Sequence, residues 1–449
     1  MRHRILSILL LFCTVSALSQ SSTADSLLIA QAEFAPPPDS LFVVEKVAVI
    51  GNQKTKGYVL LREMELKAGD YITADALEND RSRIYNLGLF NRVDIGYVAA
   101  EPPHATLIVA VQERWYIYPF PIAGIKDRDW KKLYFGAGLI HQNFRGRNEK
   151  LYAALVLGYD PAVILSYRNP MIDEALNDFI EAGVAWRVVR NHSITALVDS
   201  REFDERHFSA LLSIGRRFGV AHTIRASAGF SYVRVSDYRT GRTMSPSGED
   251  SFPVLGLGYT YDTRDAADYA LAGEFVRATI TKSGVPGSSL DFVRYAGDFR
   301  RFVPLVSRLT LAGHVFGDLV AAGPTPSYNR TYFGYDQRIR GHFYEVYEGE
   351  CQFGASSELR FALLPARYIK LGFIPVPEFS VWKFGVFLAA FADAGTVWFR
   401  GEPFALNRFL GGYGAGVHIL LPYGFVLRME YARNRRSSGE LILDFTSAF

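Results

Sequence analysis

Apolar and polar residues alternate with a period of two along most of the chain after residue 131. In the segment EFVRATITK, Val276, Ala278 and Ile280 share one face, and the residues between them are Arg or Thr. The same alternation places Arg428 and Glu430 on the polar face of FVLRMEYA. A period of two is the side-chain repeat of a β-strand. The pattern therefore predicts strands that each have one apolar and one polar face.

The alternation divides the second part of the chain into segments of strand length. We expect sixteen strands, beginning near Lys132, Lys150, Ala162, Leu176, His192, Arg206, His222, Ser251, Ala272, Leu290, Ser307, Gly349, Val381, Gly411, Gly424 and Ser438. An even number returns the C-terminus to the side from which the chain enters, so antiparallel strands can close into a barrel. A soluble sandwich would also alternate, but its apolar faces would be internal.

The N-terminus has the order of a secretory signal peptide. Arg2 and Arg4 precede an apolar run over residues 5–12, and Ala17 and Ser19 supply small residues at a cleavage site, so residues 1–19 are predicted to be removed. Removal of the two arginines and no acid changes the formal charge from +3 to +1. Export, the strand count and the charged inner faces together favour an all-β transmembrane barrel of 16 antiparallel strands over residues 131–449.

The mature chain contains no run of eighteen apolar residues, which argues against a helical membrane protein. Cys351 is its only cysteine, so an internal disulfide is excluded and a cysteine metal site is disfavoured. Its small net charge gives no indication of a nucleic-acid partner. Residues 20–40 are small, polar and rich in proline at their end, which predicts a flexible leader.

Residues 41–114 have a mixed α+β pattern. A β-rich run ends at Gly51, after which Thr55 is predicted to cap a helix over residues 58–65. Thr73 is predicted to cap a second helix, which Gly88 ends in a left-handed conformation. Two strands follow, so two helices can cover one face of a three-stranded sheet.

The first of these two strands presents Val93, Ile95 and Tyr97 on one face. The segments IGN, AGD, LEND and IYNLGLFNRVDI of this region resemble a POTRA domain. The resemblance implies a periplasmic module whose sheet edge receives other chains by β-augmentation. The alternative is a small α+β spacer that binds nothing. Residues 115–130, which are aromatic and rich in proline, are expected to form a linker.

A long polar loop within the barrel region carries Arg340 and Gly341. A guanidinium beside a residue that can turn sharply suits a loop tip folded into a polar cavity, and it would need a carboxylate partner. Glu358 and Asp393 lie on strands whose alternation turns them inward. The alternative is that Arg340 lies on a solvated surface loop.

The barrel region resembles the BamA/TamA superfamily of outer-membrane assembly and translocation proteins. The similar segments are GAGLIHQNFRGRNEKL, SYRNP, YTYDTRDAADYALAGEF, the Arg340-Gly341 loop, FADAGTVW and GYGAGVHILLPYGFVLRMEYA. The resemblance implies that the loop enters the lumen and that Arg340 pairs with Asp393 and Glu358. This chain departs from the family pattern at His342, the residue directly after Arg340-Gly341, where the family usually has an aromatic residue.

The chain ends in LILDFTSAF, which places Phe445 and Phe449 on one face and resembles the assembly signal of outer-membrane barrels. An ordinary amphipathic edge strand would look the same. We expect the seam between the first strand, residues 132–142, and the last, residues 438–449, to be weakened by Gly136 and Gly138.

The sequence contains no serine hydrolase elbow, no His-Glu-x-x-His zinc motif and no phosphate-binding Gly-Lys-Ser/Thr loop. The acids Asp262, Asp265 and Asp268 could hold Ca²⁺, but a polar turn closed by Arg264 is favoured. The barrel histidines are scattered without the clustering of metal ligands. We therefore expect no enzyme, no metal and no cofactor.

The expected function is to assist insertion or translocation of other polypeptides at the Gram-negative outer membrane, with the POTRA domain in the periplasm. The expected partners are unfolded or partly folded client polypeptides, outer-membrane lipid and periplasmic accessory proteins. The alternative is a passive pore or structural barrel whose POTRA domain binds a partner.

Overall fold

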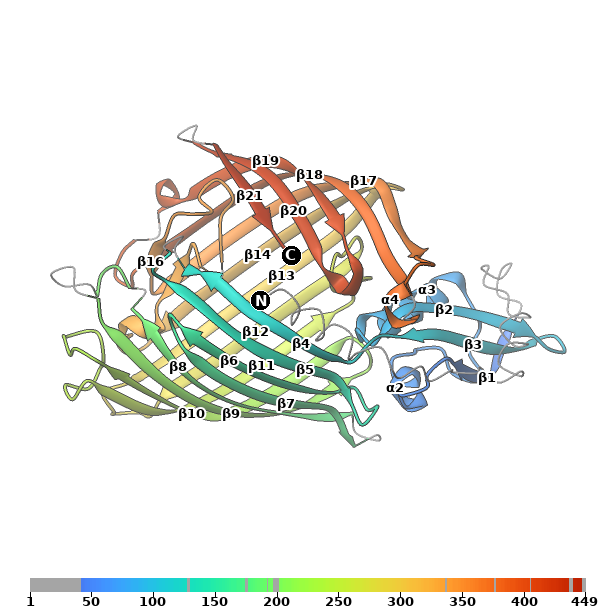
Figure 1. The fold of residues 1–449 in the computed structure, drawn as a ribbon, viewed down its shortest axis with the longest axis horizontal. Helices are drawn as coiled ribbons and strands as arrows, with labels where there is room; N and C mark the ends of the chain where they lie inside the picture. The colour runs from blue at the N-terminus through green and yellow to red at the C-terminus, as the bar shows by residue number, and fades with distance from the viewer. Residues whose placement is uncertain are drawn as a thin grey trace, which may run out of the picture.

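The computed structural model describes residues 42–126, 130–173, 177–191, 193–196, 202–335, 337–374, 377–403, 405–435 and 439–445. The expected signal peptide, the leader and Phe449 lie outside these residues. The described chain forms a small N-terminal domain, residues 42–114, set against one end of a barrel (Figure 1). Within these ranges, no helix is both long enough and apolar enough to cross a membrane.

The N-terminal domain is a three-stranded sheet covered by helices. Its elements are β1 (Val43–Ile50), α2 (Gly57–Leu61), α3 (Ala74–Asn86), β2 (Phe90–Ala99) and β3 (His104–Glu113). The sheet order is β1-β3-β2, with β1 parallel and β2 antiparallel to β3. The expected α+β arrangement is therefore present, and β2 is an edge strand.

Of the two expected helix caps, one is confirmed and one is wrong. The Thr73 hydroxyl accepts a hydrogen bond from the Ala76 amide at 3.2 Å, and Gly88 follows α3 with a φ of +71°. Thr55 caps nothing, because α2 begins later, after Lys56. The Thr55 hydroxyl is buried instead between the Tyr116 hydroxyl (2.8 Å) and the Asn143 amide (2.9 Å), where it joins the domain to the barrel.

The core of the N-terminal domain lies between α3 and the sheet. Val93, Ile95 and Tyr97 share one face of β2, as predicted, and all three are buried against α3 and the inward residues of β3. Their side chains therefore stabilise the domain and leave the backbone of β2 available at the edge of the sheet.

The barrel is one sheet of sixteen antiparallel strands, as predicted. In chain order the strands are β4 (Ile117–Ile125), β5 (Leu133–Phe144), β6 (Glu149–Gly158), β7 (Ala162–Asp173), β8 (Asp178–Arg190), β9 (Asp204–Phe218), β10 (His222–Val235), β11 (Glu249–Asp262), β12 (Gly273–Gly284), β13 (Asp291–Val306), β14 (Leu309–Ala321), β17 (Cys351–Lys370), β18 (Val381–Trp398), β19 (Leu410–Leu420), β20 (Val426–Asn434) and β21 (Gly439–Asp444).

Short elements lie between the barrel strands. They are the 3-10 helices η2 (Ser327–Asn329), η3 (Leu406–Arg408) and η4 (Pro422–Gly424), the small helix α4 (Pro377–Ser380), and the hairpin of β15 (Thr331–Phe333) with β16 (Tyr347–Gly349). The β15–β16 hairpin belongs to the long loop between β14 and β17, and it holds both ends of the segment that carries Arg340.

Two assignments from the sequence are wrong: one expected strand is not formed, and one segment assigned to the linker is a strand. The total of sixteen is therefore unchanged. The segment expected near His192 is not a strand, because the described residues 193–196 form a bend and a turn. Residues 117–125, assigned to the linker, form β4 and pair with β5 along their whole length. The first strand of the barrel is thus β4. Gly136 and Gly138 lie in β5, which pairs on both sides, so they are not at the seam.

The wall keeps the predicted alternation. On β11, Leu255 and Leu257 point outward and are 55% and 61% exposed, an arrangement that suits a lipid-facing surface and would be unfavourable in water. On the neighbouring strand β10, Arg225 points inward and pairs with Glu181 of β8 at 3.1 Å. The lumen is therefore polar and the outer wall apolar.

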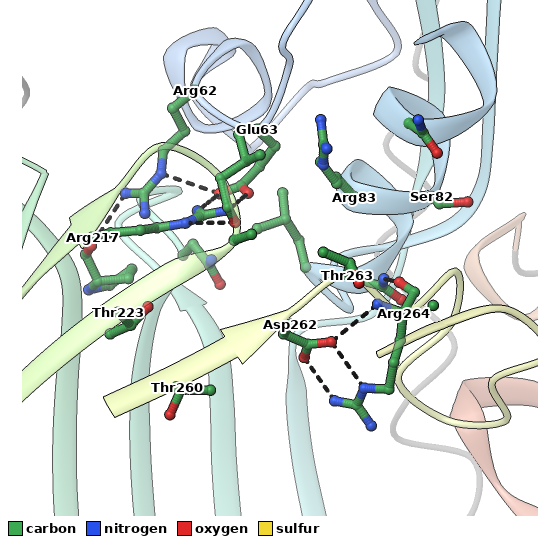
Figure 2. A pocket seen from close by; sticks show the side chains of 18 of the residues that line it. Arg62, Glu63, Ser82, Arg83, Arg217, Thr223, Thr260, Asp262, Thr263 and Arg264 are labelled. Carbon is green, nitrogen blue, oxygen red and sulfur yellow. Dashed lines mark hydrogen bonds and ion pairs between the residues drawn. The ribbon is translucent and has the colours of Figure 1, made fainter. Parts of the chain in front are cut away.

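The N-terminal domain is fastened across the mouth of the barrel by polar contacts. Glu63, after α2, accepts two hydrogen bonds of 2.6 Å from Arg217 at the end of β9 (Figure 2). Asn86 of α3 donates to the Arg264 carbonyl at 3.0 Å and accepts from the Ala267 amide at 2.9 Å. These contacts hold both helices against turns of the barrel.

The turn at residues 262–268 has the predicted character. Arg264 is bound by both carboxylate oxygens of Asp262, at 2.9 and 2.7 Å. Asp265 accepts backbone hydrogen bonds from Ala266 and Leu271. Its carboxylate is thus occupied in closing the turn.

Candidate functional site

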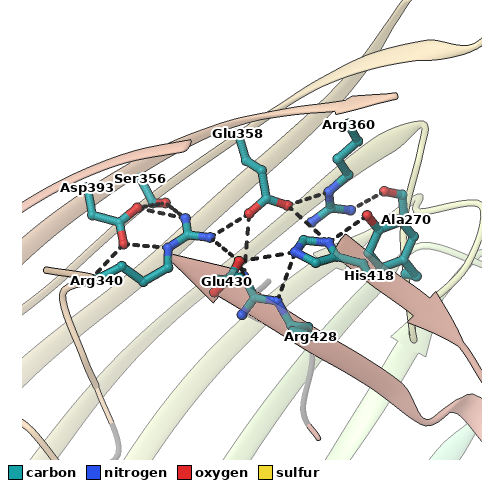
Figure 3. Close-up of polar contacts among 10 residues, drawn as sticks. Ala270, Arg340, Ser356, Glu358, Arg360, Asp393, His418, Arg428 and Glu430 are labelled. Carbon is teal, nitrogen blue, oxygen red and sulfur yellow. Dashed lines mark hydrogen bonds and ion pairs between the residues drawn. The ribbon is translucent and has the colours of Figure 1, made fainter. Parts of the chain in front are cut away.

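The loop between β14 and β17 folds into the lumen and delivers the Arg340 side chain to the inner wall (Figure 3). Arg340 is 4% exposed, which excludes the alternative of a solvated surface loop. Gly341 has a φ of +99°, a conformation that L side chains rarely adopt. A Cβ on Gly412 of β19 would lie 1.7 Å from the Arg340 carbonyl oxygen, so the backbone of the loop needs this glycine in the wall.

Every N–H of the Arg340 guanidinium has an acceptor. Nε and one terminal nitrogen bind the two oxygens of Asp393 at 2.8 and 2.7 Å. The other terminal nitrogen binds Glu358 at 2.7 Å and Glu430 at 2.9 Å, and the remaining donor reaches the Ser356 hydroxyl at 3.0 Å. Both carboxylates expected from the sequence therefore contact Arg340.

The face of the guanidinium also has a partner, because its central carbon lies 3.6 Å from the ring centroid of Phe391. Full use of the donors and of the flat face fixes the side chain in one position. A lysine, with three donors on a flexible stem, could not reproduce this arrangement.

The acids of this site are shared with two further arginines. Glu358 also binds Arg360 at 2.8 Å, and Glu430 also binds Arg428. His418 lies between them and contacts Glu430 at 3.0 Å. We call the set of Arg340, Glu358, Arg360, Asp393, His418, Arg428 and Glu430 the lumenal arginine cluster.

The lumenal arginine cluster is balanced in charge, with three guanidinium groups and three carboxylates around the histidine. Charge balance and the many hydrogen bonds offset much of the large cost of removing these charges from water, although one oxygen of Glu430 has no hydrogen-bond partner among the described residues. Glu358, His418 and Glu430 could in principle hold a metal ion, since their ligand atoms lie within 4.8 Å of one another. The carboxylates already bind three arginines, so a divalent cation would be placed among positive charges, and the donor set does not suit one.

The loop tip is attached to the last strand of the barrel. Glu440 of β21 accepts hydrogen bonds from the backbone amides of Gly341 (2.6 Å) and Phe343 (3.1 Å). The Tyr344 hydroxyl donates to the Leu441 carbonyl at 2.9 Å. The loop thus bridges the wall strands that hold Arg340 and the strand that ends the sheet.

The other residues selected from the sequence lie elsewhere. His342 does not enter the lumenal arginine cluster and contacts Glu345 within its own loop at 3.0 Å. Phe445, just after β21, is 59% exposed on the outward face. Val93, Ile95 and Tyr97 belong to the N-terminal domain, apart from this cluster.

Sequence reasoning missed Arg360, His418, Arg428, Glu430 and Glu440 as members of this site. A signal was present for Arg428 and Glu430, because both fall on the polar face of one strand. This alternation was not sufficient, because many inward positions of a barrel are charged. Only the contacts made by the Arg340 loop show which of them form a site.

Comparison with known families divides the chain in the same way as the structure. Residues 143–440 match the Omp85 superfamily domain, and residues 42–114 match the POTRA family described as surface antigen variable number repeat. The outer membrane protein assembly factor BamA of Nitratidesulfovibrio vulgaris is 24% identical over 308 residues, which cover 67% of this chain and 37% of that protein. The chain therefore spans much less than the full length of this relative.

Two solved structures have a similar fold. The crystal structure of BamA from Haemophilus ducreyi lacking POTRA domains 1-3 gives a TM-score of 0.53 at 17% identity, covering 90% of this chain and 83% of that one. CdiB from Escherichia coli also gives 0.53, at 10% identity, covering 90% and 75% of the two chains. At these identities the likeness concerns the fold.

Proposed function

The chain belongs to the Omp85 superfamily, and from this premise we propose that it assists the insertion or translocation of other polypeptides at the outer membrane. It is an outer-membrane barrel with a periplasmic POTRA domain, and its family is not enzymatic. The relative from Nitratidesulfovibrio vulgaris is an assembly factor by name, which supports a non-covalent role with client polypeptides.

The observation that carries the proposal is the seam of the barrel. The sheet begins with β4 and ends with β21, and among the described residues no ladder joins these two strands (Figure 1). Within the described part of the chain, these two strands therefore each have one edge without a partner strand. Unpaired edges are the sites where another chain can add a strand.

The sequence of β4 explains why its outer edge stays open. The Tyr116 carbonyl accepts from the Gln142 amide of β5 at 2.8 Å, so even-numbered residues of this segment direct their backbone groups toward β5. Odd-numbered residues therefore face the seam, and two of them, Pro119 and Pro121, have no N–H. A strand at this edge could donate to β4 but would receive few bonds in return, which favours brief pairing and release.

The POTRA domain offers a second place for a client. β2 is the edge of its sheet, and β1 at the opposite edge is partly covered by a bridge between Val43 and Tyr71. We propose that a client strand first adds to β2 and then pairs at the seam, while the lumenal arginine cluster braces the wall beside β21. Accessory proteins of the periplasm would use the same edge.

The test is a reconstituted assay with a purified outer-membrane client. Liposomes that contain the protein should insert or translocate the client faster than empty liposomes, and Arg340→Ala should reduce the rate. Equal rates for wild type, Arg340→Ala and empty liposomes would refute the proposal. Photocrosslinking from Arg92 on β2 should capture the client, with Lys67, an exposed cation outside the sheet, as the matched control position.

The second candidate is a passive pore or structural barrel whose POTRA domain binds one partner. The contacts that fix the POTRA domain across the barrel mouth favour this alternative, because they would hold a static partner platform. This alternative predicts that a photocrosslinker at Arg92 captures the partner, while the liposome assay shows no client transport.

A further inference from the structure

A cavity of about 640 Å³ lies between the helices of the POTRA domain and the inner wall of the barrel (Figure 2). Six of its lining side chains are cationic and three are acidic. The cations are Arg62, Arg83, Lys150, Arg168, Arg217 and Arg264, and the acids are Glu63, Asp262 and Asp265. The rest of the lining mixes polar side chains such as Thr223 with apolar ones such as Phe179, and the lining carries more cations than acids.

The excess of positive charge arises on neighbouring strands of the barrel wall. Lys150 of β6 lies directly opposite Arg168 of β7, and Arg168 lies opposite Glu181 of β8. Glu181 is shared, because it pairs with Arg168 at 3.0 Å and with Arg225 at 3.1 Å. Within the described part of the chain, no carboxylate forms an ion pair with the Lys150 ammonium.

Like charges directly opposite each other on a sheet are destabilising. The fold offsets the cost of the Lys150–Arg168 pair only in part, since Glu181 pairs with Arg168 and Arg225 but not with Lys150. A group that brings a negative charge into the cavity would remove this cost.

The cavity already receives one carboxylate in a defined way. Glu63 is held by both terminal nitrogens of Arg217, each at 2.6 Å, and by Nε of Arg62 at 3.2 Å. This bidentate geometry is the one that arginine forms with carboxylates in general. The cavity is thus built to bind the chemical group that acidic side chains carry.

We propose that this cavity binds an acidic segment of a client polypeptide, an assignment that rests on the proposed transport function. Its volume suits a few residues of extended chain. A lipid headgroup fits less well, because the cavity lies on the inner side of the wall, which separates it from the lipid around the barrel. Lys150, which forms no ion pair among the described residues, supplies the charge that attracts the segment.

The experiment measures binding of a short fluorescent peptide of alternating Glu and Ser to the full chain in detergent, by fluorescence anisotropy. The peptide should bind, and its affinity should fall as salt rises. Lys150→Gln should weaken binding about fivefold, the size expected for one partly exposed charge pair. Lys150→Arg should restore it, and a folded barrel is verified by heat-modifiable migration on a gel.

Controls separate this site from general attraction. A matched peptide of Gln and Ser should not bind, and Lys67→Gln, which removes a cation outside the cavity, should leave the affinity unchanged. Equal binding of the Gln peptide, or equal weakening by Lys67→Gln, would overturn the proposal. Displacement of the peptide by an equal concentration of glycerol phosphate would identify a phosphate site and overturn the peptide assignment.

The outcome is separable from that of the transport assay. Client transport without binding of the Glu peptide would leave the proposed function standing and remove this site. Binding that depends on Lys150, in a protein that transports no client, would support the site as a peptide-binding cavity and refute only the transport function.

Discussion

Glu440 on the last barrel strand accepts a 2.6 Å hydrogen bond from the backbone amide of Gly341 at the tip of the lumenal loop. The bond joins the loop that carries Arg340 to one side of the open seam. Because Arg340 is itself fixed to β17, β18 and β20, the position of β21 depends on the loop as well as on its ladder with β20.

Replacing Glu440 should therefore loosen β21. Glu440→Ala leaves two partly buried amides without this acceptor and should cost the local structure about 1–3 kcal/mol. Hydrogen exchange should become faster in residues 439–444 and remain unchanged in β14. Glu402→Gln, in another loop where Glu402 pairs with the exposed Arg408, is the control and should have no effect on β21. Unchanged exchange in Glu440→Ala would show that the ladder with β20 alone holds the strand.

Arg340→Ala should be strongly destabilising, because it leaves Asp393, Glu358 and Glu430 with fewer positive partners in a buried site. The expected cost is about 3–5 kcal/mol in the free energy of unfolding, measured by denaturant titration of the folded barrel. Arg340→Lys should lie between wild type and Arg340→Ala, since it restores the charge without the fork of donors. An Arg340→Lys variant as stable as wild type would contradict the role assigned to the bidentate geometry.

Pro119→Ala combined with Pro121→Ala should allow the seam to close. The change adds two N–H donors to the outer edge of β4, where a ladder with β21 can use them. We expect a higher yield of disulfide crosslinks between cysteines introduced in β4 and β21, together with slower client transport. Pro304→Ala, in β13 away from the seam, is the control. Equal crosslinking in all three proteins would show that the prolines do not keep the seam open.

Removal of the Glu63 carboxylate should loosen the POTRA domain from the barrel mouth. In Glu63→Gln, Arg217 keeps the Val220 carbonyl as an acceptor but loses the charged carboxylate that binds two of its nitrogens, so hydrogen exchange should rise in α2 and in residues 217–220. The same variant should bind the Glu peptide more tightly, because the internal competitor is gone. Glu78→Gln, which removes an exposed carboxylate that pairs with Arg81 of α3 outside the cavity, is the matched control. Weaker peptide binding in Glu63→Gln would show that Glu63 does not compete with the peptide for the cations of the cavity.

Asp80 in α3 should make the stability of the POTRA domain depend on pH. It is fully buried and accepts from the amides of Glu65 (2.8 Å) and Leu66 (3.1 Å), and burial raises its pKa above the ordinary value. A raised carboxyl pKa means that folding takes up a proton, so the contribution of this group to stability is greatest below its unfolded pKa and declines as pH rises through the folded pKa. Asp80→Asn should destabilise the domain by about 1–3 kcal/mol.

The difference between wild type and Asp80→Asn should therefore be larger in acid than at neutral pH. This stability difference is measured by hydrogen exchange of α3 in both proteins, corrected for the intrinsic effect of pH on exchange. A difference that is constant with pH would show that Asp80 does not titrate on folding.

The barrel and the POTRA domain could be predicted from the sequence because their signals are local. Alternation with a period of two is imposed by the pleat of each strand and by the contrast between lipid and lumen on its two sides. The cap at Thr73 and the left-handed Gly88 depend only on residues near them. Arg340 could be selected, and Glu358 and Asp393 proposed as partners, because inward positions follow from the same alternation.

The errors have an equally physical origin. Pro119 and Pro121 made β4 resemble a linker, because a proline cannot donate to a ladder, yet an edge strand needs donors on one side only. Gly136 and Gly138 were placed at the seam as a consequence. Thr55 looked like a helix cap, but its hydroxyl gains more from Tyr116 and Asn143 in the buried junction with the barrel.

The sequence by itself determined the strands, the two domains and the residue that enters the lumen, since each depends on the order of neighbouring residues. Only the tertiary structure decided which charges meet. Glu430, Glu440 and Glu63 find their partners through contacts between segments far apart in the chain, and electrostatic pairing depends on distance in space. For the same reason, only the folded barrel shows that Lys150 lies beside Arg168 and, within the described residues, forms no ion pair with a carboxylate.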